Sequence, residues 1–183
     1  MLFQKKRLVK NTLRYKVAML VLNALYGRKN MYISPWQHAA VTVDGIYIYD
    51  NKLLIAKRSN NVEFAGKWQV PGGHVDMETH ETLLEALKRE TYEEHNLDID
   101  TAKIDVNNPL VVRFSTQQQY IEQQDTALLG LQYIYMLSKE EMESIQISKE
   151  ALLFKFADIA ELERMKAAGE LIHDFSYTYP YLK

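Results

Sequence analysis

The sequence predicts an α/β fold in which a mixed β-sheet is sandwiched between α-helices (α/β/α), with an added N-terminal helix. Three observations support this class. Short stretches rich in β-branched and aromatic residues recur along the chain, a strongly patterned helix interrupts them, and a second helix follows the last of them. This order of strands, helix, strands and helix is typical of helices packed against a sheet.

The individual elements follow from periodicity and from turn residues. Residues 79–95 form the clearest predicted helix, and a final helix over 157–168 ends at Gly169. A turn is expected at 50–52, and Pro71-Gly72-Gly73 predicts a sharp break. The predicted strands are, in chain order, 40–43, 46–49, 53–56, 68–70, 110–114, 128–137 and 152–156.

Composition and charge limit the possible functions. The chain has 183 residues, 47% hydrophobic and 25% charged, which is the composition of one globular domain. The absence of cysteine excludes a disulfide framework and a thiolate zinc site, and it fits a cytoplasmic protein. Residues 1–30 hold eight basic residues and no acid, so the remaining 14 basic and 24 acidic residues give the body of the chain a charge of −10. An acidic body argues against broad nucleic-acid binding and suits a protein that binds divalent cations.

The basic N-terminal segment needs a separate interpretation. Its apolar stretch 17–26 is shorter than the ~20 residues that a membrane-spanning helix requires, and Leu25-Tyr26-Gly27 makes a poor signal-peptide cleavage site. We expect residues 1–35 to form an amphipathic helix and a connector, and residues 36–183 to form the main domain. The helix is expected to pack on this domain or across a homodimer, with attachment to an anionic membrane surface as the alternative. The apolar residues at helical spacing are Val9, Leu13, Val17, Leu20, Val21, Ala24 and Leu25.

The helix predicted at 79–95 carries the chemistry. Its apolar stripe runs directly into Glu90, Glu93 and Glu94, which lie at i, i+3 and i+4 on the same face. Carboxylates placed so closely near a low-dielectric surface are costly unless they are protonated or neutralised by a cation. Mg²⁺ is the natural partner because it prefers carboxylate and water oxygens. A solvated acidic face is the alternative reading of this pattern taken alone.

The context of these glutamates resembles the signature of the Nudix hydrolase (MutT-like) family. Glu81 and Arg89 have the seven-residue spacing of the Nudix box, and the box residues from Arg89 to Leu97 match at five positions. The strand 53–58 and the approach 66–76 also resemble the family, so that the likeness covers residues 38–183. The five matching positions are Arg89, Glu90, Glu93, Glu94 and Leu97.

The box departs from the family pattern in three places. Gly73 and Glu81 are separated by seven residues where the family has five, and an alternative alignment through Glu78 would break the spacing to Arg89. Asn96 replaces a glycine after the helix, which is mild because asparagine also tolerates a left-handed cap. Thr91 stands where a larger apolar residue is usual. None of these changes removes a metal ligand.

The resemblance implies a Nudix-type hydrolase that uses Mg²⁺, for which Mn²⁺ can substitute. Its substrate would be a nucleoside triphosphate or an ADP-ribose or dinucleotide type of compound, cleaved at the diphosphate bridge by attack of water on phosphorus. By resemblance, Glu93 and Glu94 would be primary metal ligands, Glu90 a ligand or the base, and the carbonyl of Gly72 or Gly73 a further ligand. Arg89 would hold Glu81 by a bidentate contact.

Further residues are assigned to substrate binding and to other roles. Arg58, Trp68, Gly72 and Gly73 are assigned to substrate binding, although aromatic residues beside strands are usually core. His74, His80 and His95 are expected at the surface. A catalytically silent nucleotide-binding regulatory domain is the alternative function, and loss of Arg89 or of a paired glutamate would have favoured it. The candidates for an additional catalytic acid outside the box are Glu122, Asp125, Glu140, Glu141, Glu143 and Glu150.

Overall fold

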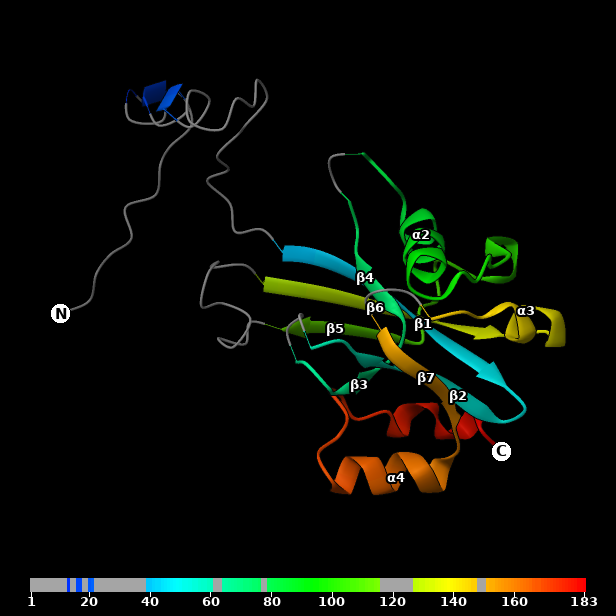
Figure 1. Ribbon diagram of the computed structural model, residues 1–183. Coiled ribbons are helices and arrows are strands. Elements are labelled where there is room, and N and C mark those ends of the chain that lie inside the picture. Colours follow the sequence, from blue (N-terminus) through cyan, green and yellow to red (C-terminus); the bar gives the residue numbers. More distant parts are fainter. Residues whose placement is uncertain are drawn as a thin grey trace.

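A mixed sheet with helices on both faces forms the body of the protein. The computed structural model describes residues 39–60, 64–76, 79–115, 127–147 and 151–183, together with Leu13, Lys16, Val17, Leu20 and Val21. Helix α2 covers one face of the sheet, and helix α4 with the C-terminal 3₁₀ segment η3 covers the other (Figure 1). This arrangement confirms the predicted α/β/α class.

The elements of the described residues have the following bounds. The strands are β1 (Ala39–Tyr49), β2 (Lys52–Arg58), β3 (Trp68–Gln69), β4 (Gly72–His74), β5 (Val111–Ser115), β6 (Ala127–Met136) and β7 (Ala151–Ala157). The helices are α2 (Leu83–His95), α3 (Lys139–Ser144) and α4 (Ile159–Ala167), with the 3₁₀ segments η1 (Thr101–Lys103) and η3 (Ser176–Tyr181).

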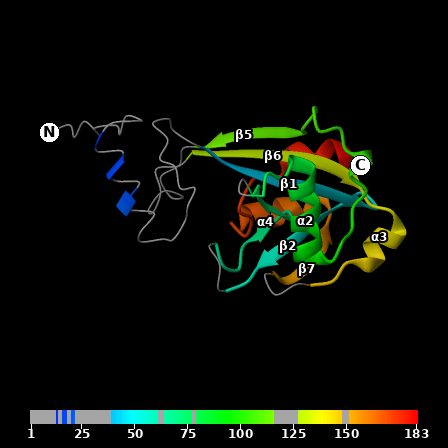
Figure 2. The ribbon, with the colours of Figure 1, turned by 90° about the horizontal axis from the view of Figure 1, so that it is seen from above.

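The sheet is split beside its central strand β1, which pairs with β2 at one end and with β4 at the other. The strand order is β3-β2-β1-β6-β5, with β4 paired to β1 and β7 paired to β2. Strands β1 and β6 are parallel along most of their length, as Figure 2 shows from above, and the remaining pairs are antiparallel. Strand β1 pairs with β2 only at Ile48 and Tyr49, and at Thr42 to Asp44 it pairs with β4 instead. The two strands therefore diverge, and the glycine segment of β4 lies against the other end of β1.

Alternation along β1 divides the core into two layers. Val43 and Tyr47 are fully buried beneath α2, whereas Ile46 and Ile48 are fully buried beneath α4. Successive side chains of a strand point to opposite faces of the sheet, so one strand supplies both cores. Burial on both sides explains why β1 is apolar almost throughout and why a polar residue within it stands out.

Most predicted strands are confirmed, with corrections at two glycine positions. The predicted strands 40–43 and 46–49 form one strand, because Asp44 and Gly45 continue the ladder with β6. The predicted break at Pro71-Gly72-Gly73 is wrong in part, since Gly72–His74 forms β4. The turn before β2 has positive φ at Asp50 (48°) and Asn51 (57°), the backbone of a tight hairpin turn.

Capping residues explain the corrections to the helices. Helix α2 begins at Leu83 rather than at residue 79, because Thr82 caps it and forms a reciprocal capping box with Glu85. The short helix α3 was not predicted, although Ser138 and Glu141 make the same capping box. The final helix spans Ile159–Ala167, two residues shorter at its start and one at its end than predicted.

The N-terminal helix and the division at residue 35 stay predictions, since these residues lie mostly outside the described part. Leu13, Val17, Leu20 and Val21, the described members of the predicted stripe, have exposed side chains. The loop predicted at 115–125 also lies almost entirely outside the described residues. Within the described part of the chain, no helix is long and apolar enough to cross a membrane.

Candidate active site

Two of the residues that depart from the family pattern, Asn96 and Thr91, fit the structure of α2. Asn96 adopts φ 53° and donates its backbone N–H to the Tyr92 carbonyl, as expected for a left-handed cap. Thr91 is fully buried, and its hydroxyl donates to the Leu87 carbonyl at 2.7 Å and contacts the Tyr47 hydroxyl. A small polar residue therefore fits the position, since it pairs with a tyrosine hydroxyl from β1.

Arg89 holds three glutamates and the glycine strand together. Its Nε and Nη2 donate to Glu81 at 3.0 and 2.7 Å, which confirms the predicted bidentate contact. Its Nη1 donates to Glu90 at 2.8 Å and Glu93 at 3.1 Å, and Nη2 also donates to the His74 carbonyl at 2.9 Å. All the donors of a guanidinium are engaged in this way. The hydrogen bonds to Glu81 raise the pKa of Arg89, and the same contact lowers the pKa of Glu81.

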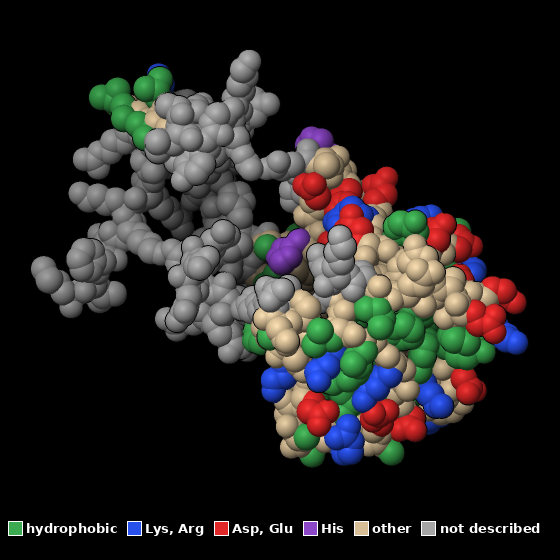
Figure 3. Space-filling view, in the orientation of Figure 1, with side chains coloured by type: hydrophobic (Ala, Val, Ile, Leu, Met, Phe, Trp, Pro, Cys, Tyr) green, Lys and Arg blue, Asp and Glu red, His purple; other side chains and the backbone are tan. Residues whose placement is uncertain are grey.

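Glu81 lies ahead of α2 rather than within it. Besides Arg89, it accepts a hydrogen bond from the backbone N–H of Asp76, and its side chain is only 11% exposed. His80 beside it has φ 59°, so the chain turns sharply just before the cap at Thr82. The longer spacing between Gly73 and Glu81 is therefore accommodated before the helix, and the Arg89 contact is kept. In Figure 3, acidic side chains gather around basic ones beside α2.

Glycines bring β4 close to the glutamates. The Gly72 N–H donates to Glu94 Oε2 at 3.0 Å. A Cβ at Gly73 would lie 2.4 Å from the Glu90 carboxyl carbon, and one at Gly72 would lie 2.4 Å from the Val43 carbonyl oxygen. Gly72 also has φ 151°, a conformation that side chains disfavour. Gly72 therefore requires glycine because the β1 backbone lies directly against it, and at Gly73 the Glu90 carboxylate occupies the place that a side chain would take.

A cavity of about 360 Å³ lies beside this contact. This volume falls within the range of small-molecule sites, roughly 300–1,000 Å³. Glu90 and Glu94 form its acidic wall, with side chains 16% and 12% exposed. Arg58 and Gln69 also line the cavity, and Arg58 Nη1 donates to Gln69 Oε1 at 2.8 Å. The other lining residues are Thr42, Asp44, Phe64, Gly72, Gly73, His74, Leu128, Ile172 and His173.

The donors in this cavity fit a hard divalent cation. Glu90 and Glu94 offer carboxylate oxygens beside the backbone of Gly72 and Gly73. Among the described residues, no three acidic or histidine side chains converge into a preformed metal site. Mg²⁺ does not need such a cage, since it is usually held by one or two carboxylates, waters and the phosphates of the substrate. The pair of glutamates is therefore sufficient for a metal that arrives with its substrate.

Four predicted site residues, Glu81, Arg89, Glu93 and Trp68, do not line the cavity. Glu93 is 58% exposed and bonded to Arg89, so its role as a metal ligand stays a prediction. Trp68 is buried in the core under α4, with its ring centroid 4.4 Å from Lys155 Nζ, so its assignment to substrate binding stays a prediction that the cavity does not support. His95 is not at the surface but fully buried against Phe154, and neither of its ring nitrogens has a hydrogen-bond partner.

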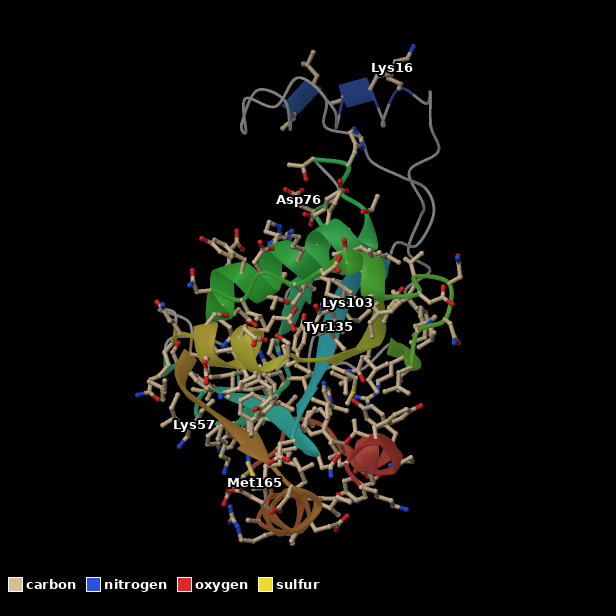
Figure 4. The ribbon with its side chains drawn as sticks, turned by 90° about the vertical axis from the view of Figure 1, so that its right-hand side faces the viewer. Lys16, Lys57, Asp76, Lys103, Tyr135 and Met165 are labelled. Atoms are coloured by element: carbon tan, nitrogen blue, oxygen red, sulfur yellow. The ribbon has the colours of Figure 1, made fainter. Side chains whose placement is uncertain are left out.

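None of the described candidates for an additional acid lines the cavity. Glu140, Glu141 and Glu143 lie on α3, and Glu141 accepts a hydrogen bond from Tyr135 and pairs with Lys103. Figure 4 shows Lys103 and Tyr135 side by side at that end of the sheet. The remaining candidates, Glu122, Asp125 and Glu150, lie outside the described residues.

Asp44 is the acid that the sequence reasoning missed. It lines the cavity, and burial raises its pKa to about 6 against the opposing effect of a hydrogen bond from Gln132. A lone carboxylate within a strand of β-branched and aromatic residues was the available signal. His173 also lines the cavity and was missed, and burial lowers its pKa. Nothing in the local pattern around His173 indicates that the C-terminal segment returns to the site.

Two solved structures have a similar fold. The MutT protein from Methanosarcina mazei Go1 has a TM-score of 0.58 at 17% identity, covering 80% of this chain and 94% of that one. A bifunctional NMN adenylyltransferase/ADP ribose pyrophosphatase from Francisella tularensis, complexed with AMP and a manganese ion, has a TM-score of 0.57 at 16% identity. That match covers 92% of this chain and 46% of the other, and identities this low show the fold alone.

The sequence comparisons identify the family. A stretch of 60 residues is 52% identical to an ADP-ribose pyrophosphatase of Methanocaldococcus jannaschii, but it covers only 33% of this chain and 34% of that protein. The family model of the NUDIX domain matches residues 38–175, which include the glycine strand, Arg89 and the three glutamates. The chain therefore belongs to the NUDIX domain family.

Proposed function

We propose that the protein is a Mg²⁺-dependent pyrophosphohydrolase that cleaves the diphosphate bridge of a nucleoside diphosphate-linked compound, with ADP-ribose as the first substrate to test. The observation that carries this proposal is the cavity wall formed by Glu90 and Glu94, which Arg89 and Gly72 hold in place. The curated relative of similar sequence is named an ADP-ribose pyrophosphatase, which supports the substrate class.

The acidic wall explains why a cation is needed. A diphosphate carries negative oxygens that would be repelled by two carboxylates of low exposure. Glu90 and Glu94, with the carbonyl of Gly72 or Gly73, would hold Mg²⁺. When bound, the metal would neutralise the phosphate oxygens and lower the pKa of water at the reacting phosphorus.

The protein residues divide the remaining work. Arg58 lines the same cavity as Glu90 and would supply a positive charge for a phosphate oxygen. If Glu90 is not a metal ligand, it would be the base that accepts the proton of the attacking water, with Arg89 orienting it through Oε1. Arg89 itself does not line the cavity, so it acts by positioning the carboxylates. Phe64 adds an apolar surface for the organic part of the substrate.

A panel of substrates tests this proposal. ADP-ribose, nucleoside triphosphates, dinucleotides and sugar nucleotides are incubated with Mg²⁺, with Mn²⁺ or with EDTA, and the products are separated by chromatography. We expect metal-dependent release of a nucleoside monophosphate, and at least ~100-fold less activity in Glu94→Gln, which loses a ligand charge. Glu143→Gln on α3 is the matched control, because Glu143 is 60% exposed and lies outside the cavity. Equal activity in the two variants would contradict the metal assignment, and binding of nucleotides without turnover would favour a regulatory domain.

The N-terminal segment is proposed to act in assembly rather than in catalysis. Its described apolar side chains are exposed, with Leu13 at 78% and Leu20 at 73%. Exposed apolar surface of this kind marks an interaction site. The charge of +8 on residues 1–30 also opposes the −10 of the remaining chain, which favours docking on the domain or on a second copy.

A further inference from the structure

Asp44 lies beside the acidic wall of the cavity, but its side chain is on the opposite face of the sheet from α2. Alternation along β1 places its side chain on the same face as Ile46, which packs under α4. Its Oδ1 lies 2.6 Å from the point where a Cβ on Gly72 would stand, and the Gly72 N–H is bonded to Glu94. Asp44 is therefore adjacent to the metal-binding wall while belonging to the other face of the sheet.

A chain of hydrogen bonds fixes the orientation of this carboxylate. Gln132 is 2% exposed, and its Nε2 donates to Asp44 Oδ2 at 2.9 Å. The Tyr177 hydroxyl donates to Gln132 Oε1, which determines which end of the amide faces Asp44. Arg113 lies over the Tyr177 ring, with its Cζ 5.0 Å from the ring centroid. No other protein donor among the described residues reaches Asp44, so its Oδ1 is available to a ligand in the cavity.

The chemistry of Asp44 restricts what that ligand can offer. An ionised carboxylate only accepts hydrogen bonds, so a phosphate oxygen would be repelled and a donor is required. Asp44 lines the same cavity as Glu90 and Glu94 and lies against Gly72, so the carboxylate lies close to the place proposed for the diphosphate. The groups attached directly to the diphosphate in the proposed substrate class are sugars, and hydroxyls are the donors they carry.

We propose that Asp44 is a specificity-determining residue that accepts a hydrogen bond from a hydroxyl of the sugar next to the substrate's diphosphate. Gln132 and Tyr177 are positioning residues that hold the carboxylate for this contact. The sugar would extend from the acidic wall over β1 and β6, where Thr42, Leu128 and His173 line the cavity. The inference rests on the proposed function, which supplies the position of the diphosphate.

The test pairs a change in the protein with a change in the substrate. Asp44→Asn and the wild type are assayed with ADP-ribose and with analogues that each lack one hydroxyl of either ribose. For one analogue we expect the wild type to lose about 10- to 100-fold in kcat/KM, the effect of one hydrogen bond to a charged group. Asp44→Asn should show a similar loss on ADP-ribose and no further loss on that analogue. The loss should appear in KM, with kcat within a few-fold, because the sugar is not the reacting group.

Two further variants make the result specific. Tyr177→Phe should give part of the same loss, since it releases Gln132 without touching the cavity, and it serves as the test if Asp44→Asn does not fold. Asp98→Asn is the matched control, because Asp98 is 71% exposed and pairs with Lys88 on the surface. Its discrimination among the analogues should equal that of the wild type.

Two outcomes would overturn the inference. In the first, Asp44→Asn still discriminates among the hydroxyl analogues as the wild type does. In the second, Asp44→Asn loses kcat at unchanged KM and its metal requirement is altered. If the wild type hydrolyses nothing in the panel, the proposed function fails instead. Calorimetric binding of AMP, of ribose 5-phosphate and of the 2′- and 3′-deoxy forms of both to the wild type and to Asp44→Asn then tests the hydroxyl contact by itself. Equal affinities across that set would overturn it.

Discussion

Replacing Arg89 should lower the stability of the folded protein, whatever its effect on catalysis. Arg89→Met keeps much of the apolar stem but removes five hydrogen bonds to Glu81, Glu90, Glu93 and the His74 carbonyl. The most protected partner is Glu81, whose side chain is 11% exposed and which would keep a charge facing little water. The variant therefore leaves an unpaired carboxylate between the loop and α2.

The expected magnitude lies between two limits. Breaking a fully buried ion pair costs about 3–5 kcal/mol, whereas an exposed pair contributes about 0–1 kcal/mol. Arg89 is 33% exposed, so we expect a loss of about 2–3 kcal/mol in the free energy of unfolding. For a chain of this size that corresponds to roughly 5–10 °C in Tm. Because the folded pKa of Glu81 lies below its ordinary value of 4.5, this stabilisation is present above that pH and lost as the pH falls through the folded pKa.

A double-mutant cycle with Glu81→Gln measures the pair directly. The four proteins are unfolded by urea in EDTA, which removes any contribution from bound metal. Glu81→Gln should make Arg89→Met less costly, with a coupling energy of about 1.5–3 kcal/mol for a bidentate charged contact. The difference in the free energy of unfolding between the wild type and Arg89→Met should also become smaller below pH 4.5. Additive effects, or a loss under ~0.5 kcal/mol for Arg89→Met, would refute the view that this pair organises the site.

Three further predictions concern other parts of the chain. Glu93→Gln should lower kcat by at least ~100-fold if Glu93 leaves Arg89 for the metal, and a near-wild-type rate would restrict the ligands to Glu90 and Glu94. His95→Leu should raise stability by about 1–2 kcal/mol, because two unpaired ring nitrogens are removed. Burial lowers the His95 pKa to about 4, so wild-type stability should fall as the pH drops from 6.5 toward 4 while that of His95→Leu should not, and parallel pH profiles would contradict this. Deleting residues 1–30 should lower the solubility or change the oligomeric state measured by light scattering, with the rate per folded active site within a few-fold. A truncated protein that stays soluble in the same oligomeric state would favour membrane attachment or targeting.

The parts of the fold that were predictable are those in which local pattern and global packing agree. The two halves of β1 were predicted from their β-branched and aromatic residues, and α2 was predicted from an apolar stripe that does lie on the sheet. The Arg89–Glu81 contact was implied by the box spacing and survives two extra residues. The contact is kept because the two extra residues lie before the Thr82 cap, in the loop, and do not change the rotation of the helix.

The parts that were missed depend on contacts distant in the sequence. Trp68 lies beside the box, but the register of β3 on β2 turns its ring toward α4 and away from the cavity. His95 follows two glutamates, yet its helical position points it inward against Phe154. His173 reaches the cavity only because Trp68 bridges to Leu171, which brings the C-terminal segment back to the sheet. No local signal specifies that return.

The cavity combines two parts of the chain that can vary independently. The acidic wall comes from α2 and β4, where the glutamates, Arg89 and the glycines constrain one another closely. The opposite wall comes from β1, β6 and the C-terminal segment, where Asp44 is oriented by Gln132 and Tyr177. Substitutions in the first wall should affect metal use and kcat for every substrate, since each one disturbs the carboxylates. Changes at Gln132 or Tyr177 in the second should alter which sugar is accepted, because these two residues orient Asp44 and do not line the cavity. Within one NUDIX domain, the reaction and the choice of substrate would then be set by opposite faces of the same sheet.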